Sequence, residues 1–166
     1  VPHGGKYYPE PPIYLRINSG HGLKGRSKSA EKGESNLAAF MFQHFFEGVG
    51  EMLTAPVVEY VVDKNELSVK VKFKDNEVTE SGRIWWMYDR GPDGSFDYIS
   101  ELFPEDQTNT MTYNKKDQSW NVKIPLKTGV SKIDFFSNHG KTLNYNDRPY
   151  ATYMSSPYQS ITLKKN

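Results

Sequence analysis

The chain contains no cysteine among its 166 residues. Disulfide bridges, thiolate metal sites and a cysteine nucleophile are therefore excluded within it. It also has almost no excess charge, because 21 Lys and Arg residues face 20 Asp and Glu residues, for a net charge of +1. A nucleic-acid-binding surface needs a basic excess or stripe, so we expect no nucleic-acid partner.

Long hydrophobic runs are also missing. The mean hydropathy is −0.72, and no run approaches the roughly 18 apolar residues that span a membrane. The first residues, Val1-Pro2-His3, do not form a signal peptide. No two histidines have the spacing of a metal site, so we expect neither a metal nor a cofactor. Aromatic residues, in contrast, make up 14% of the chain, which a disordered chain would lack.

The N-terminal third predicts a strand, a loop and a helix. Residues Ile13–Ile17 place apolar side chains on one face of a short strand, and a helix is expected from Glu31 to Glu47 because apolar residues recur at helical spacing. This helix is apolar around most of its circumference, so we expect cover on more than one side and a partner outside the chain. An interdomain helix and a dimer contact remain alternatives.

From Pro56 onward the hydrophobic period changes to two, as in Leu67–Phe73, where apolar residues alternate with Ser68 and lysines. Turn signals separate further strand candidates at Val57–Val62, Arg83–Tyr88, Asp97–Phe103, Thr108–Tyr113, Ser119–Ile124, Ser131–Phe136, Tyr150–Met154 and Gln159–Leu163. Short strands at this spacing are typical of a β-sandwich of immunoglobulin or fibronectin type. We therefore expect a mostly β protein with two parts, residues 1–54 and a sandwich over residues 55–166.

The most specific chemical signal is His21, in the run Asn18-Ser19-Gly20-His21-Gly22. A strand, a Gly-flanked histidine and a helix in this order are typical of the end of an α/β-hydrolase domain, where the triad histidine comes last. A surface histidine in a glycine-rich loop is the alternative. Ser19 does not lie in Gly-x-Ser-x-Gly, so we do not expect it to be the nucleophile. The nucleophile and the acid would then lie outside this chain, which we expect to be part of a larger enzyme.

The adjacent residues Trp85 and Trp86 point to opposite faces of their predicted strand. One is expected in the sandwich core. The other either contacts a neighbouring domain or forms an aromatic surface for a sugar.

The acidic residues Asp89, Asp93 and Asp97 recur every four positions. Their spacing does not match a calcium loop, so an acidic turn is expected. His139 is expected in a turn after its strand.

The stretch Tyr14–Leu23 and the run Asn36-Leu37-Ala38-Ala39-Phe40 resemble the end of the catalytic domain in the PhoPQ-activated pathogenicity-related (PqaA-like) proteins. The segments Leu67–Phe73, Ile84–Tyr88, Ile133–Phe136 and Thr152–Pro157 resemble the C-terminal β-domain of that family. The resemblance covers nearly the whole chain but only the last part of the family's length.

This resemblance implies an exported, virulence-linked α/β-hydrolase parent, with His21 as its triad histidine and the rest of the hydrolase domain as partner. The sandwich is then an accessory domain, and the chain alone is expected to be inactive. The alternative is a non-catalytic module that binds carbohydrate or protein. A complete small enzyme is not supported, because no nucleophile, base and acid can be assembled from the residues present.

Overall fold

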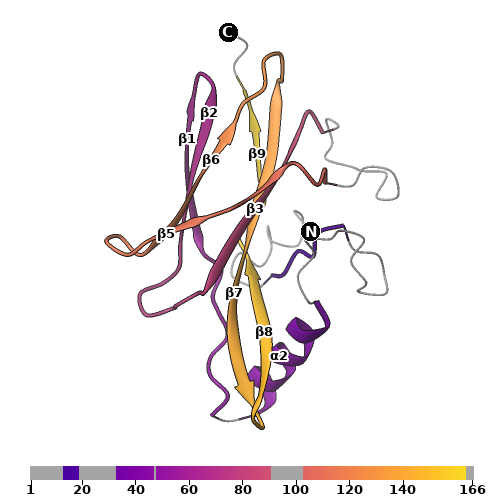
Figure 1. The fold of residues 1–166 in the computed structure, drawn as a ribbon, viewed down its shortest axis with the longest axis vertical. Coiled ribbons are helices and arrows are strands. Elements are labelled where there is room, and N and C mark those ends of the chain that lie inside the picture. Colours follow the sequence, from indigo (N-terminus) through magenta and orange to yellow (C-terminus); the bar gives the residue numbers. More distant parts are fainter. Residues whose placement is uncertain (1–12, 19–32, 47, 91–102, 164–166) are drawn as a thin grey trace, which may run out of the picture.

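The computed structural model describes residues 13–18, 33–46, 48–90 and 103–163, which form two antiparallel sheets and one helix (Figure 1). The first sheet has the order β1-β2-β6-β5, with β1 Val57–Asp63, β2 Glu66–Lys72, β5 Thr112–Asn114 and β6 Ser119–Pro125. The second has the order β4-β3-β7-β8, with β9 also paired to β7. Its strands are β3 Ser81–Tyr88, β4 Thr108–Thr110, β7 Lys132–Tyr145, β8 Arg148–Ser155 and β9 Gln159–Thr162.

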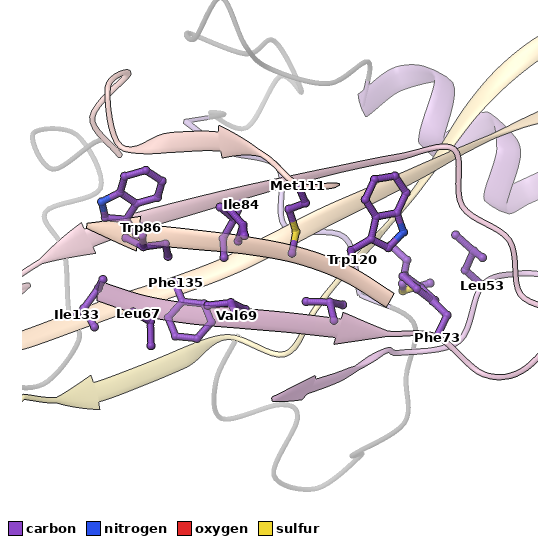
Figure 2. Close-up of a cluster of buried hydrophobic side chains, with 14 of the residues drawn as sticks. Leu53, Leu67, Val69, Phe73, Ile84, Trp86, Met111, Trp120, Ile133 and Phe135 are labelled. Carbon is purple, nitrogen blue, oxygen red and sulfur yellow. The ribbon is translucent and has the colours of Figure 1, made fainter. Parts of the chain in front are cut away.

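The main core lies between the two sheets (Figure 2). In β2 every second residue is buried, Leu67, Val69 and Val71, because successive side chains of a strand point to opposite faces. These residues meet Ile84 and Trp86 of β3 and others of the second sheet in one cluster. Each fully buried aliphatic side chain contributes about 1.5–3 kcal/mol. The expected mostly β fold with two packed antiparallel sheets is therefore confirmed.

The predicted single strand Thr108–Tyr113 is wrong. The chain forms β4, passes Met111, and continues as β5 in the opposite sheet. Met111 is buried in the core between the sheets. Its backbone N–H donates to the carbonyl of Gly82, so the crossing point is held from both its side chain and its backbone.

Strands β7 and β8 form a long hairpin that extends past the rest of the sandwich, at the bottom of Figure 1. Tyr145 pairs with Arg148 across a two-residue loop, Asn146-Asp147, and these two residues have positive φ values of 48° and 59°. This is the backbone shape that two-residue hairpins favour, and Asn and Asp tolerate it well. The predicted turn at this position is confirmed, but β7 runs well beyond the expected end at Phe136.

Helix α2, Gly33–Phe45, lies along this hairpin (Figure 1), within the predicted range Glu31–Glu47. Ala39 is fully buried and joins Val49 and Leu143 of β7 in a small second cluster. The ring of Phe42 stacks on Tyr145 at 4.3 Å between centroids. The helix is therefore attached to the hairpin by one side.

The predicted strand at residues 13–17 is wrong, because residues 13–16 have no regular secondary structure and Ile17 lies in a turn. The segment lies beside the end of β8 instead. The carbonyl of Ile13 accepts from the N–H of Ser155, and the N–H of Leu15 donates to the Ser155 hydroxyl. The predicted strand Asp97–Phe103 lies outside the described residues except for Phe103.

Candidate functional site

His21, the residue expected to carry chemistry, lies outside the described residues, as does Ser19. The described chain stops at Asn18, three residues earlier. The Asn18 side chain is fixed to the sandwich by two hydrogen bonds with the backbone of Phe103, each 2.8 Å long. The chain is therefore held against the β-domain at Asn18, three residues before His21 in the sequence. The catalytic role of His21 stays a prediction.

Neither Trp85 nor Trp86 is exposed as a ligand platform. Trp86 packs in the main core, and Trp85 is fully buried on the opposite face of the second sheet. There Trp85 lies in a cluster with Met87, Phe136 and Ile17. Both faces of the second sheet are thus covered, one by the first sheet and the other partly by the segment 13–18.

A buried serine–histidine pair lies in β7. The Ser137 hydroxyl and His139 Nε2 are 2.8 Å apart, and both residues are fully buried. His139 Nδ1 has no hydrogen-bond partner, so no acid orients the ring. Burial lowers the pKa of His139 to about 3, which keeps the ring neutral. The expected turn at His139 is wrong, because the residue lies within a strand, and the pair fits a structural role in the core.

Asp89, the first residue of the predicted acidic turn, has a structural role. Asp89 Oδ1 accepts hydrogen bonds from the Ser131 N–H, the Ser131 hydroxyl and the Lys132 N–H. Burial opposes ionisation of this carboxyl, but the hydrogen bonds outweigh it and hold its pKa below the usual value. Asp93 and Asp97 lie outside the described residues. Within the described ranges, no group of three His, Asp or Glu side chains is arranged to hold a metal ion.

The sequence did not predict a polar cluster on the face of the second sheet that points away from the first sheet. Arg90 Nη1 donates to the Tyr158 hydroxyl, and its guanidinium lies 5.6 Å from the centre of that ring. Asp134, which is almost fully buried, lies near both Tyr158 and Lys132, whose Nζ is 3.6 Å from its carboxylate. Burial raises the pKa of Tyr158, and the Asp134 charge raises it further, against the opposing effect of Arg90. No pattern in the sequence pairs these distant residues.

A cleft of about 830 Å³ opens at the end of the sandwich, between the β1–β2 turn, the β6–β7 turn and the end of β9. Its lining combines apolar side chains, including Val62, Leu126 and Leu163, with the charged residues Asp63, Lys64 and Lys127. None of its lining residues is aromatic. It therefore offers no surface on which a sugar ring could stack.

Helix α2 and the segment 13–18 together close the free edge of β8. The N–H groups of Ala151, Tyr153 and Ser155 alternate along this edge, and they donate to Ser35 Oγ, Asn36 Oδ1 and the Ile13 carbonyl. These bonds satisfy backbone groups that an edge strand leaves unpaired. They also attach the N-terminal elements to the sandwich at three successive positions.

The opposite side of α2 is apolar and exposed. Leu37, Met41 and Phe45 lie at i, i+4 and i+8, so they form one stripe along the helix, and their exposed fractions are between 49% and 64%. We call these three residues the α2 stripe. The sequence predicted that this helix is covered on more than one side. Within the described chain, only the side that packs on the hairpin is covered.

Comparison with known proteins gives no family for this chain, since neither a protein-family model nor a curated protein matches it. Within the described ranges, no helix has both the length and the apolar character to cross a bilayer.

Proposed function

We propose that this chain is the accessory β-sandwich region of a larger exported α/β-hydrolase-like protein and is not catalytic by itself. The observation that carries the proposal is the α2 stripe. Helix α2 is fastened to β8 through Ser35 and Asn36, while Leu37, Met41 and Phe45 face outward. A helix held in this way presents an apolar surface suited to packing against the rest of a hydrolase domain.

Two further features support this proposal. Asn18, three residues before His21 in the sequence, is anchored to the sandwich by two hydrogen bonds with the Phe103 backbone. The sheet orders β1-β2-β6-β5 and β4-β3-β7-β8 follow the A-B-E-D and C′-C-F-G orders of immunoglobulin-type sandwiches. They support an immunoglobulin-like accessory domain, as the resemblance to the PhoPQ-activated pathogenicity-related family implies.

The catalytic part of the proposal is tested with an activated ester. The chain alone should show no burst of acylation, whereas the longer protein that contains it should turn the ester over. In that longer protein, His21→Ala should lower turnover by roughly 10⁴-fold or more, as loss of a triad member does. Full activity of the His21→Ala protein would show that the proposed role of this residue is wrong.

The docking part is tested by Met41→Glu. In the longer protein the substitution should lower the melting temperature, because a carboxylate would be buried in an apolar contact. In the chain alone it should change stability by no more than about 0.5 kcal/mol. Val78→Glu is the matched control, because Val78 is exposed but belongs to the connection between β2 and β3 and not to α2. Equal effects of the two substitutions in the longer protein would contradict docking through the α2 stripe.

The second candidate function is a non-catalytic binding module, and the cleft at the end of the sandwich favours it. The mixed lining, with Lys64 and Lys127 beside apolar side chains, suits a protein segment better than a sugar. Glycan-array binding should be absent. Binding of a protein partner should weaken when Lys127 is replaced by Glu and remain when Val78 is replaced by Glu.

A further inference from the structure

Strand β1 is an open sheet edge of unusual character. Its seven residues pair with β2 in an unbroken register from Val57↔Lys72 to Asp63↔Glu66, and β1 ends the first sheet. Within the described part of the chain, no strand pairs with its other side. The edges formed by β4, β5 and β9 are only three or four residues long. The β8 edge is closed by α2 and Ile13.

The β1 edge also lacks the features that prevent strand pairing. Natural sheet edges are protected by lysine, proline, bulges or a covering element. β1 contains no lysine and no proline, and its register has no bulge. Val57 and Val61 on its outer face, and Tyr60 and Val62 on its inner face, are exposed. The Tyr60 ring makes an edge-to-face contact with Phe135 of the second sheet, at 6.0 Å between ring centres.

We propose that β1 pairs antiparallel with β1 of a second copy of this chain, so that the two first sheets become one continuous sheet. The two-fold axis would pass at Tyr60, with Tyr60 opposite Tyr60 of the second copy and Val58 opposite Val62. Because β1 ends both first sheets, the joined sheet would have the order β5-β6-β2-β1-β1-β2-β6-β5.

The order of residues in β1 selects this register. Antiparallel pairing about a two-fold axis keeps inner-face residues opposite inner-face residues, so the axis must pass through a residue and not between two. Centred on Tyr60, the arrangement pairs all seven residues and places Glu59 and Asp63 each opposite a valine. A shift to Glu59 would place this acid opposite itself, and a shift to Val61 would place Glu59 opposite Asp63. Like charges directly opposite each other are unfavourable.

The proposed register also avoids like-charge contacts that β2 would not offset. Lys70, which lies opposite Glu59 in β2, forms its ion pair with Asp117, at 3.1 Å between Lys70 Nζ and Asp117 Oδ2. The inner row of Val58, Tyr60 and Val62 would continue into the same row of the second copy. Side chains that are exposed at the open edge of one sandwich would thereby be covered by the other.

Cross-linking tests the register directly, because the chain has no cysteine of its own. Tyr60→Cys should form a covalent dimer under mild oxidation with oxidised glutathione, since directly opposite Cβ atoms lie within disulfide reach. Val62→Cys is the matched control. It lies on the same face with nearly the same exposed fraction, 45% against 44%, but would be about 13 Å from its counterpart, four residues along the strand. Equal cross-linking of the two variants would overturn the proposal.

Charge variants at Val61 test the interface without a covalent bond. Val61 would lie opposite Glu59 of the second copy. Because Val61 is exposed, the fold should tolerate either Glu or Lys at this position. By sedimentation equilibrium the unmodified chain should approach twice its mass of 19.1 kDa as concentration rises. Val61→Glu should weaken the dimer about 2- to 30-fold, and Val61→Lys should tighten it by a similar factor.

Met41→Glu should leave the dimer affinity unchanged. This result would show that the dimer forms through β1 and not through the α2 stripe. A monomer at every concentration would overturn the proposal, and so would equal weakening by Val61→Glu and Val61→Lys. Binding of an extended peptide to β1 in a chain that stays monomeric would identify a different occupant and would also overturn it.

Discussion

The amide side chain of Asn18 forms a reciprocal pair with the backbone of Phe103. Its Nδ2 donates to the Phe103 carbonyl, and its Oδ1 accepts from the Phe103 N–H. Asn18 has a positive φ of 47°, a conformation that Asn adopts more readily than most residues. One side chain therefore fixes the end of the segment 13–18 to a part of the chain that lies 85 residues further along the sequence.

Replacing Asn18 should loosen this junction in a graded way. Asn18→Gly removes both hydrogen bonds but keeps the positive φ, so we expect a loss of about 1–3 kcal/mol in unfolding free energy. Asn18→Ala should cost about 1 kcal/mol more, because alanine resists that backbone conformation. Urea unfolding gives the order, and amide exchange at Phe103 should accelerate in both variants. Equal stability of the two variants would show that the backbone conformation contributes nothing.

His139 should make the protein acid-sensitive. Its pKa is about 3 in the folded chain and about 6.5 when unfolded. Between these values the unfolded state binds a proton that the folded state does not, so stability is lost as the pH falls below about 6.5. The steepest loss is about 1.4 kcal/mol per pH unit from this residue.

The check is a series of urea unfolding curves at different pH values for the natural chain and for His139→Gln. The substituted protein should show a shallower fall between these two pKa values, since its side chain does not titrate. The carboxylates are the same in both proteins, so their contribution to the pH dependence of stability cancels in the comparison. Identical pH slopes would contradict the assignment of a neutral, buried imidazole.

Gly82 should tolerate no side chain. A Cβ there would lie 2.9 Å from His139 Nδ1 and 2.9 Å from Trp120 Cε3, and both rings are buried. Gly82→Ala should therefore cost about 1–3 kcal/mol, as overpacking of a core does. Gly140→Ala is the matched comparison, because its close neighbours are the half-buried Tyr153 ring and the exposed Ser81, which can move. Thermal unfolding should show the larger loss for Gly82→Ala.

The three tryptophans should behave as buried core residues in fluorescence quenching and on substitution. Trp85, Trp86 and Trp120 are all buried, so acrylamide should quench the native fluorescence slowly and the urea-unfolded fluorescence quickly. Trp85→Ala should destabilise the chain by about 3–5 kcal/mol. A change of native fluorescence on adding oligosaccharide would instead support a sugar-stacking role.

Much of the sandwich was predictable from local pattern. The alternation in Leu67–Phe73 identified β2, and the turn signal at Asn144–Asp147 marked the turn between β7 and β8, although the predicted strand before it ended at Phe136. The Thr108–Tyr113 run could not reveal its division at Met111, because a strand that changes sheets keeps the same alternation on both sides of the crossing. The segment 13–17 resembled a strand by its apolar period, yet it meets β8 through single hydrogen bonds and one side chain.

The candidate site was less predictable than the fold. The pattern of α2 indicated that the helix would need cover on more than one side, but not that Ser35 and Asn36 would fasten it to β8. For Trp85 and Trp86 the sequence left one side chain open between a domain contact and a ligand surface. The cover over Trp85 comes from residues distant in the chain, including Ile17, and no local pattern encodes that contact.

The sequence by itself determined the class of the fold, the absence of thiol chemistry and the apolar character of both sides of α2, because composition and hydrophobic period act through neighbouring residues. The tertiary structure alone decided which edge is closed and which is open. The β8 edge is capped by residues more than 100 positions earlier in the chain, whereas no strand of the described residues pairs with the outer side of β1. Such contacts depend on how segments far apart in the sequence pack together, and a local sequence pattern does not encode that packing.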